Sequence, residues 1–417
     1  MEVTPELATA KARVPNQSSV PDGWRHVRLT EVARLESGHT PSKRQPDYWG
    51  GTIPWVSLHD TEGLDAWEIQ TTSQRITEAG LSNSSARLLP KGTVVFSRTA
   101  TVGKSTVMGR AMATSQDFAC YVCGPEVHNF YLALLLRSMR TEWKKLMAGS
   151  IHNTVYMPVF KTLSVDLPPH DEQVAIANAM RDVERMIDSL EQLLTKKRQI
   201  KQGAMQEMLI GQRRLPGFDQ PWISRRFAEV ASVSRERVNP SALSKPPLCI
   251  ELEHLQPGTG RLSGDAFKSQ QAATKSVFRQ GDVLFGKLRA YLRKYWLAEF
   301  DGVCSTEIWV MRPRGELASS AYLFYTVQRD DFIEAASTAY GTHMPRSDWK
   351  VVSEFDLSLP RDWREQAAIA TTLSDMDAEI TALESRLSKA RALKQAMAQA
   401  LLTGRIRIPL PPQEPAA

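Results

Sequence analysis

The sequence predicts an α+β protein: two mixed α/β domains joined by two long antiparallel coiled-coil helices, with a pseudo-twofold internal repeat. The first observation behind this prediction is a duplication with a period near 190 residues. The second is a heptad pattern of apolar residues in the most strongly repeated segment. The third is the alternation of short apolar runs with Gly, Pro, Asn and Asp turns elsewhere, which is typical of strand-rich domains.

The duplication is clearest between residues 172–216 and 365–409, which align without a gap at an offset of 193 with 19 identities in 45 positions. The rest of each half repeats more loosely, and the offset drifts between 187 and 198. The matching positions are Trp24 with Trp222, Gly92 with Gly281, Tyr131-Leu132 with Tyr322-Leu323, Met157-Pro158 with Met344-Pro345, and Leu167-Pro168 with Leu359-Pro360. One scaffold therefore occurs twice with different loops, as two readers of two different targets would require.

The strongly repeated segment predicts a long helix in each half. Its apolar residues step alternately by four and three, which is an a/d seam. The seam residues are Ile176, Met180, Val183, Ile187, Leu190 and Leu194 in the first copy, and Ile369, Leu373, Met376, Ile380, Leu383 and Leu387 in the second. A Leu-Pro pair precedes each helix, and Gly211 or Gly404 follows as a C-cap signal. About 38 residues at ~1.5 Å per residue give a length of ~57 Å.

The chain order is domain, helix, domain, helix, so the second helix must run antiparallel to the first and end near the first domain. A generic helical hairpin used for oligomerisation is the alternative reading of this pattern. We expect a flexible N-terminal tail, a first domain, a spacer helix, a second domain, a second spacer helix and a C-terminal tail. Their predicted limits are 1–21, 22–168, 169–211, 212–358, 359–405 and 406–417.

Within the two domains, apolar runs predict strands and longer periodic stretches predict helices. The predicted strands are 93–96, 118–122, 282–285 and 307–310, and the predicted helices are 130–147 and 321–336.

Composition bounds the function without fixing it. The chain has 52 Lys and Arg against 46 Asp and Glu, a net charge of +6, which permits a nucleic-acid partner but does not demand one. The polar N-terminus lacks the apolar region of a secretory signal, and no run is long enough to span a bilayer. Four cysteines in 417 residues indicate a reducing compartment, so we expect a cytoplasmic protein.

Basic side chains follow the same Gly-x-Val-x-Phe strand in both halves. Residues 286–296 contain four cations, two tyrosines, a tryptophan and no acid, and residues 97–110 contain three cations and no acid. Such stretches suit phosphate contact, and an Arg in the major groove can address guanine. The predicted DNA-binding residues are Lys287, Arg289, Arg293 and Lys294 in the second half and Arg98, Lys104 and Arg110 in the first. A solvated strand edge protected by cations is the alternative.

The motifs of catalysis and metal binding are incomplete. The stretch 102–105 imitates the end of a P-loop, but Arg98 stands where its first glycine would be. Cys120 and Cys123 form a lone CxxC, which is more typical of buried small residues than of zinc ligands. Asn239-Pro240-Ser241 lacks the second proline and the aromatic of an amino-methyltransferase motif. We therefore predict no catalytic residue, no metal site and no cofactor in this chain.

The order of these motifs resembles the specificity subunit of a Type I restriction–modification system, from about Trp24 to Gly404. The most specific marks are Leu167-Pro168-Pro169 followed by Glu172-Gln173, their repeat at Leu359-Pro360 and Glu365-Gln366, and the run Gly-Lys-Leu-Arg-x-Tyr-Leu-Arg-Lys at 286–294. The first half departs from this pattern, with Ser97-Arg98-Thr99-Ala100 in place of Gly-Lys-Leu-Arg.

The resemblance implies that each half is a target-recognition domain reading one part of a bipartite, asymmetric site in double-stranded DNA, with the helices fixing the gap. It further implies a non-catalytic subunit that binds two modification subunits. Those subunits would carry S-adenosylmethionine and methylate adenine, and added restriction subunits would cleave DNA using ATP and Mg²⁺. Two alternatives are a structural adaptor that uses the helical rod only for assembly, and a self-contained methyltransferase–nuclease.

Overall fold

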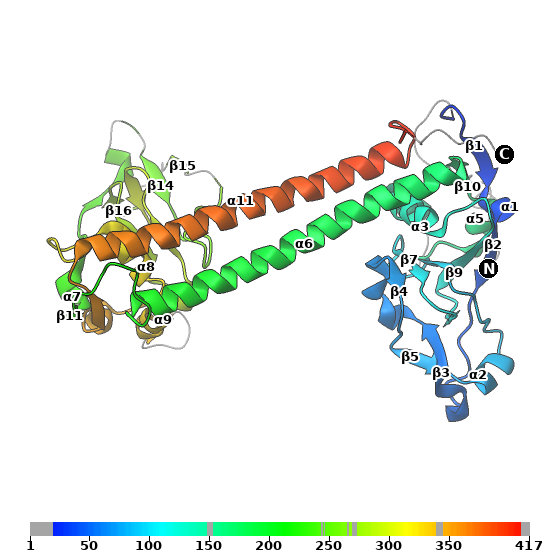
Figure 1. Cartoon of the computed structure of the whole chain (residues 1–417), viewed down its shortest axis with the longest axis horizontal. Coiled ribbons are helices and arrows are strands. Elements are labelled where there is room, and N and C mark those ends of the chain that lie inside the picture. The colour runs from blue at the N-terminus through cyan, green and yellow to red at the C-terminus, as the bar shows by residue number, and fades with distance from the viewer. Residues whose placement is uncertain are drawn as a thin grey trace. The chain divides into compact units, whose positions relative to one another are not determined.

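The computed structural model describes residues 20–147, 153–242, 245, 247–264, 267–268, 273–338 and 345–409. The chain forms two compact units (Figure 1). Unit 1 comprises Met1–Ser189 and Leu387–Ala417, and unit 2 comprises Leu190–Arg386. The end of the chain thus belongs to the same unit as its first domain, as the connectivity argument predicted.

Unit 1 is built on a five-stranded sheet in the order β2-β9-β6-β7-β4, beside a three-stranded sheet β5-β3-β8 and a two-stranded ribbon β1-β10. The helix α3 lies against β6 and β7 of the larger sheet (Figure 1). The strands are β1 Arg25–Arg28, β2 Ala33–Ser37, β3 Trp49–Val56, β4 Glu68–Ile69, β5 Gln74–Ile76, β6 Val94–Ser97, β7 Ser105–Met108, β8 Ala113–Thr114, β9 Phe118–Cys123 and β10 Ser164–Leu167. The short helices are α1 Leu29–Val32, α2 Glu78–Ser82, α3 Asn129–Ser138, α4 Arg140–Met147 and α5 Met157–Thr162.

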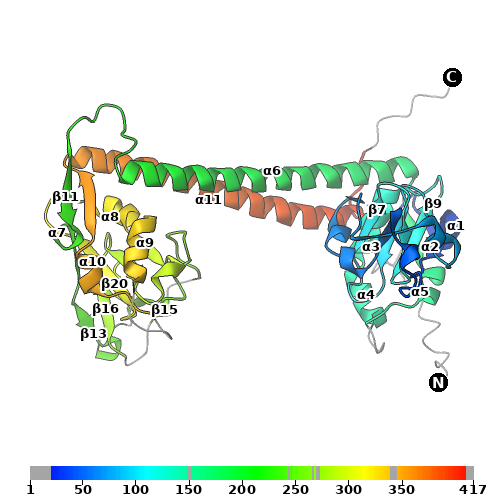
Figure 2. The same ribbon diagram turned by 90° about the horizontal axis from the view of Figure 1, so that it is seen from below.

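Unit 2 contains a four-stranded sheet β12-β20-β17-β18, a five-stranded sheet β13-β16-β19-β14-β15 and a ribbon β11-β21. The helix α8 packs on β17, β18 and β20. Figure 2 shows α8 and β20 in this unit. The strands are β11 Trp222–Arg226, β12 Ala231–Val233, β13 Arg237–Val238, β14 Leu248–Ile250, β15 Phe267–Lys268, β16 Lys275–Phe278, β17 Val283–Gly286, β18 Tyr295–Leu297, β19 Gly302–Cys304, β20 Ile308–Pro313 and β21 Asp356–Pro360. The short helices are α7 Phe227–Val230, α8 Ser320–Thr326, α9 Asp330–Ser337 and α10 Trp349–Ser353.

The two units share one scaffold. The strand order β2-β9-β6-β7 recurs as β12-β20-β17-β18, and the ribbon β1-β10 recurs as β11-β21. The turn before the central strand also recurs, because Gly92 and Gly281 both adopt a left-handed backbone with φ of 87° and 86°. The second sheet is only partly alike: the order β5-β3-β8 recurs as β15-β14-β19, with the same parallel pair, but unit 2 adds β13 and β16 at the edge. The predicted duplication with dissimilar insertions is therefore confirmed.

A buried aromatic on the central strand anchors the core of each unit. In unit 1 the ring of Phe96 lies 4.8 Å from that of Trp143 and 5.4 Å from that of Phe160, measured between centroids. In unit 2 Phe285 occupies the equivalent position on β17 and lies 5.7 Å from Phe332. Packing of these rings fixes the helices that follow each sheet.

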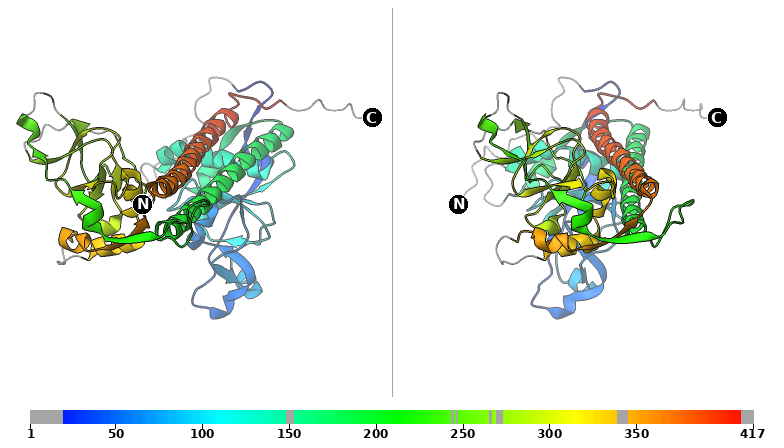
Figure 3. Two further views of the ribbon diagram at one scale, coloured as in Figure 1. Left: turned by 60° about the vertical axis from the view of Figure 1, so that its left-hand side comes forward. Right: turned by 90° about the vertical axis from the view of Figure 1, so that its left-hand side faces the viewer.

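The long helices are α6 His170–Leu209 and α11 Trp363–Leu401. Ten of the twelve predicted seam residues are buried, and Val183 and Met376 are partly buried. In unit 2, Lys201 pairs with Asp377 at 2.6 Å and Arg198 with Glu384 at 2.6 Å, so residue numbers fall on α6 as they rise on α11. The helices are therefore antiparallel, and Figure 3 shows them side by side.

Both predicted domain helices are interrupted. The stretch 130–147 forms α3 and α4 with a break at Met139, because the buried Trp143 donates its indole N–H to the Leu136 carbonyl at the end of α3, at 2.8 Å. The stretch 321–336 forms α8 and α9, and between them the buried Arg329 donates to the carbonyl of Leu209 at 3.0 Å. In unit 1 the side chain thus caps the end of α3, whereas in unit 2 the residue between the two helices contacts the end of α6 instead.

The match of Met157-Pro158 with Met344-Pro345 was wrong. Met157 and Pro158 form the first turn of α5, whereas α10 begins at Trp349, four residues after Pro345. Met344 lies outside the described residues. The backbone N–H of Leu29 donates to the carbonyl of Leu163, just after α5, and the N–H of its counterpart Phe227 donates to the carbonyl of Phe355, just after α10. The structural equivalent of α5 is therefore α10.

None of the helices in the described part of the chain has the length and hydropathy that a membrane span requires.

Candidate nucleic-acid interface

The loops that carry the predicted DNA-binding residues follow the central strand of each unit and have the same backbone closure. In unit 1 the N–H of Ser97 donates to the carbonyl of Lys104 at 2.9 Å. In unit 2 the N–H of Gly286 donates to the carbonyl of Lys294 at 2.8 Å. The two loops are therefore structural equivalents, although their sequences differ and the second is one residue longer.

The same equivalence extends to the neighbouring turn. The N–H of Arg98 donates to the carbonyl of Asp117 at 3.0 Å, and the N–H of Lys287 donates to the carbonyl of Glu307 at 3.0 Å. Each loop thus starts with a cation held beside a turn that carries an acid. Sequence comparison placed Arg98 opposite Lys287, but the shared backbone hydrogen bond is visible only in the structure.

Both loops also contain two left-handed residues at matching places. The first is Ala100 with φ of 58° in unit 1 and Arg289 with φ of 55° in unit 2. The second precedes the closing lysine and is Gly103 with φ of 97° or Arg293 with φ of 53°. Residues with a Cβ seldom adopt this conformation, and they do so mostly where surrounding contacts impose it, often at functional sites.

Two of the four predicted cations in unit 2 have partners inside the protein. The guanidinium of Arg293 pairs with Asp330 at 2.5 Å, and the ammonium of Lys294 donates to the carbonyl of Leu252 at 2.6 Å. Burial raises the pKa of Asp330, but the hydrogen bond and charge of Arg293, together with hydrogen bonds from Gln206 and Gln202, hold that pKa below its ordinary value. Arg293 and Lys294 therefore position the loop.

Lys287 and Arg289 are different. Arg289 is exposed and Lys287 is half-buried, and within the described residues neither side chain has a recorded hydrogen bond or ion pair. Beside them, Arg346 pairs with Glu307 at 2.9 Å, so that acid already has a cation. These two side chains are the ones in this loop that remain available for phosphates.

Unit 1 shows the same division. Arg98 donates to the carbonyl of Gln116 at 2.9 Å, and burial lowers its pKa. Lys104 pairs with Asp65 at 2.6 Å. Arg110 is exposed after β7, with no partner recorded among the residues described. Direct DNA contact by any of the seven cations stays a prediction.

A further pair of residues, which sequence reasoning marked only as a motif, connects each domain to the long helices. Gln173 is fully buried; its side-chain oxygen accepts from the N–H of His128 at 2.8 Å, and its amide donates to the carbonyls of Glu126 and Pro168, each at 2.9 Å. Gln366 makes the corresponding contacts in unit 2, donating to Leu317 at 2.8 Å and Pro360 at 2.9 Å.

The glutamate before each of these glutamines pairs with an arginine that follows the other long helix. Glu365 pairs with Arg214 at 2.7 Å in unit 2, and Glu172 pairs with Arg407 at 2.5 Å in unit 1. Both carboxylates are almost completely buried. Arg214 and Arg407 are identical positions of the internal repeat, a signal that could have predicted the pairing.

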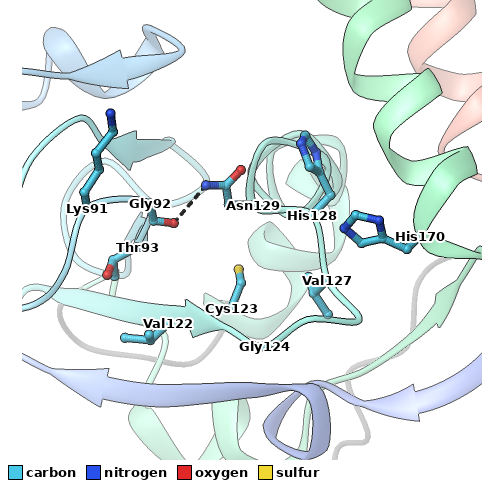
Figure 4. A pocket seen from close by; sticks show the side chains of 10 residues that line it. All are labelled: Lys91, Gly92, Thr93, Val122, Cys123, Gly124, Val127, His128, Asn129 and His170. Carbon is cyan, nitrogen blue, oxygen red and sulfur yellow. Dashed lines mark hydrogen bonds between the residues drawn. The ribbon is translucent and has the colours of Figure 1, made fainter.

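A cavity of about 290 Å³ in unit 1 is lined by His128, His170, Asn129 and Lys91 among others (Figure 4). The two imidazole rings lie 6.0 Å apart, and the buried Nδ1 of His128 has no partner among the described residues. Burial, and then the neighbouring His170, lower the pKa of His128. The arrangement favours a neutral His128 and offers no acid–base pair with an evident substrate.

The cysteines are not poised for chemistry. Cys120 and Cys123 are free thiols, and burial raises the pKa of each to about 12. A thiolate is the form that binds metals and attacks substrates, so both are disfavoured for these roles. Within the described part of the chain there is no cluster of three or more His, Cys, Asp or Glu that could hold a metal ion.

The chain is similar to proteins of one kind. The family described as "Type I restriction modification DNA specificity domain" matches residues 21–202 and 266–390. The EcoDI specificity subunit of Escherichia coli is 22% identical over 93% of this chain and 89% of its own. The MjaIX specificity subunit of Methanocaldococcus jannaschii is 26% identical, over only 41% of this chain and 40% of its own length.

Solved structures share the fold. The HsdS subunit from Thermoanaerobacter tengcongensis has a TM-score of 0.56 at 20% identity and covers 93% of this chain and 98% of that one. The S subunit from M. genitalium has a TM-score of 0.52 at 13% identity, over 93% and 98% of the two chains. Because the family match spans most of the sequence and both of its halves, this chain belongs to the Type I restriction–modification DNA specificity family, the family of S subunits.

Proposed function

We propose that this chain is the non-catalytic DNA-recognition subunit of a Type I restriction–modification complex and reads a bipartite, asymmetric site. Each unit contacts one part of the site, and the paired helices set the gap. The observation that carries this proposal is one scaffold present twice, with second sheets that differ in strand number because unit 2 adds β13 and β16. Equal scaffolds present equivalent surfaces to DNA, while unlike insertions give the two ends of the site different sequences.

The structure of the loops at 97–104 and 286–294 supports the proposal that they contact the DNA backbone. In both units a left-handed turn follows the central strand beside cations, and two cations of unit 2 have no described partner. Phosphate contacts by such side chains position a protein on the duplex and release counterions, so binding should weaken steeply with salt. Base reading then falls to side chains of the loops and of the second sheets.

The helices support a fixed spacing. They contain 40 and 39 residues, which at ~1.5 Å per residue is ~60 Å, against ~34–36 Å for a turn of B-DNA. Antiparallel ion pairs and a buried seam make such a pair stiff. The gap in the DNA site would therefore depend on helix length and not on either reading unit.

The chemistry would belong to partners. In this proposal two modification subunits carry S-adenosylmethionine and methylate adenine, and restriction subunits, where present, cleave DNA using ATP and Mg²⁺. A solved structure that describes complex assembly of the type I R-M system matches 94% of this chain with a TM-score of 0.57, which supports a multisubunit assembly.

The test is co-expression of the chain with its modification subunit, followed by mapping of methylated adenines in the host DNA. A motif with two defined ends and an unspecified gap is the expected result. Methylation without sequence preference, or a single uninterrupted motif, would contradict the proposal.

A second test separates DNA reading from a purely structural adaptor. Lys287→Ala combined with Arg289→Asn removes two available cations, and Asn tolerates the left-handed backbone at that position. We expect about 10-fold weaker DNA binding at moderate salt and a shallower salt dependence. Arg314→Ala is the matched control, because Arg314 is exposed after β20, at the end of the sheet opposite the loop. An adaptor would show no difference between the two variants.

A further inference from the structure

The loop between β17 and β18 carries an apolar tip that phosphate contact does not explain. Tyr291 is 55% exposed and Leu292 is 37% exposed, side by side in the short turn Ala290–Leu292. Single exposed apolar residues are common, but a tyrosine and a leucine adjacent at a loop tip leave a combined apolar surface in water. Such an exposed apolar surface indicates a binding site for another molecule.

The tip stands on a base that restricts its movement. Arg289 and Arg293, immediately on either side of the turn, both have a left-handed backbone, with φ of 55° and 53°. Within the turn the N–H of Leu292 donates to the carbonyl of Arg289 at 2.9 Å, and the N–H of Arg293 to that of Ala290 at 2.8 Å. Two such residues persist together only where the surroundings hold them.

Three neighbouring segments restrain the backbone of this loop. The N–H of Gly258 donates to the carbonyl of Arg293 at 2.8 Å, and the N–H of Arg289 donates to the carbonyl of Pro345 at 2.9 Å. The side chain of Arg293 reaches Asp330 at the start of α9. Ala290 is 3% exposed and fills the core beneath the tip. The apolar side chains are thus presented in a fixed direction, which lowers the entropic cost of inserting them into a partner.

We propose that Tyr291 and Leu292 form a wedge that enters one base step of the DNA half-site read by unit 2 and partly unstacks it. This inference rests on the proposed function. Proteins that deform DNA insert apolar side chains between base pairs in this way, and stacking on an aromatic ring compensates the lost base stacking. Lys287 and Arg289 beside the tip favour DNA over an apolar protein surface as the occupant, because they can neutralise the flanking phosphates.

The wedge belongs to one unit only. The equivalent loop of unit 1 is one residue shorter, and its tip consists of Thr101 and Val102, which are both partly buried. It offers no exposed aromatic between its two left-handed residues, Ala100 and Gly103. We therefore expect distortion in one half of the site, where flexible base steps would be preferred even without direct base contacts.

The experiment uses the complex of this chain with its modification subunit and a duplex containing the site found by methylation mapping. A 2-aminopurine is placed in turn at each position of both half-sites except the methylated adenines, because methyltransferases flip their target base out of the duplex. Its fluorescence rises when its base is unstacked. The wild-type complex should raise the fluorescence at one of these positions in the half-site of unit 2 and at none in that of unit 1. Tyr291→Ala with Leu292→Ala should abolish this rise and weaken binding about 10-fold or more.

Two controls keep the result interpretable. Tyr291→Phe retains the ring and should retain the rise, whereas Leu88→Ala removes an apolar side chain that is 48% exposed in unit 1 and should change nothing in the half-site of unit 2. Circular dichroism checks that each variant is folded. Because the mutated side chains are exposed, the fold should tolerate the changes.

The outcomes that overturn the wedge are distinct from failure of the proposed function. Tight, site-specific binding by the wild type without any fluorescence rise would overturn the wedge alone. A rise that survives in the double variant would also overturn the wedge. If the double variant lost the modification subunit while keeping the fluorescence rise, the tip would be assigned to a protein contact instead of DNA. Absence of site-specific binding by the wild type would overturn both proposals.

Discussion

Arg407 and Glu172 are 235 residues apart in the sequence and form a two-point ion pair, with nitrogen–oxygen distances of 2.5 and 2.6 Å. The carboxylate is 2% exposed and starts the first long helix, whereas the arginine follows the second. Their contact joins the end of the described chain to the first domain. Glu365 and Arg214 make the same contact in unit 2, so an equivalent ion pair attaches each domain to the long helices.

Arg407→Ala should lower the free energy of unfolding of unit 1 by about 2 kcal/mol. The change leaves Glu172 buried without its cation, which costs about 3–5 kcal/mol for a fully buried pair and less here because Arg407 is 40% exposed. Urea denaturation of the purified chain measures the effect. Arg405→Ala is the control, since Arg405 is exposed nearby. Equal midpoints for the two variants would show that the pair contributes nothing.

Gln173→Ala should be more damaging, by about 3 kcal/mol, because it removes the partners of one backbone N–H and two carbonyls in a buried site. The start of α3 should then exchange its amide hydrogens faster than the rest of unit 1, as measured by hydrogen exchange with mass spectrometry. Gln399→Ala alters an exposed glutamine and should leave exchange unchanged. Uniform protection of α3 in both variants would contradict the assigned role.

Unit 1 should lose stability in mild acid through His128. Its pKa is lowered by burial and then by His170, so the neutral ring is favoured in the folded state. That contribution is fully present above the ordinary histidine pKa of about 6.5 and is lost as the pH falls through the lower folded value. Thermal denaturation from pH 7.5 to 5 should show a smaller loss for His128→Gln than for the wild type. His39→Gln, at an exposed ring, should follow the wild type.

The helices and the shared scaffold could be predicted because their signals are local or duplicated. Heptad spacing marks Ile187, Leu190 and Leu194 directly, and all three are buried. The second sheets could not be predicted, since β3 with β8 and β14 with β19 pair in parallel across long stretches of chain with no periodic mark. Such non-local pairing depends on tertiary context.

The candidate interface was only partly predictable for a related reason. A run of basic residues indicates a charged loop, but it does not reveal that Arg293 and Lys294 are used to hold the loop, while Lys287 and Arg289 have no described partner. The sequence matches Ser97 to Gly286, but only the structure shows the backbone hydrogen bonds that close the two loops in the same way. The sequence therefore marks a basic loop, whereas the structure shows which of its cations have partners inside the protein.

The most direct measurement lengthens both helices together. Seven residues that continue the heptad are inserted after Ser189 in α6 and after Arg386 in α11, close to opposite points of the antiparallel pair, and the methylated site is mapped again. Seven residues add ~10 Å, about three base pairs of B-DNA. A gap widened by about three base pairs between two unchanged ends is the predicted result. An unchanged gap, or altered ends, would contradict a stiff pair of helices that sets the distance between two independent readers.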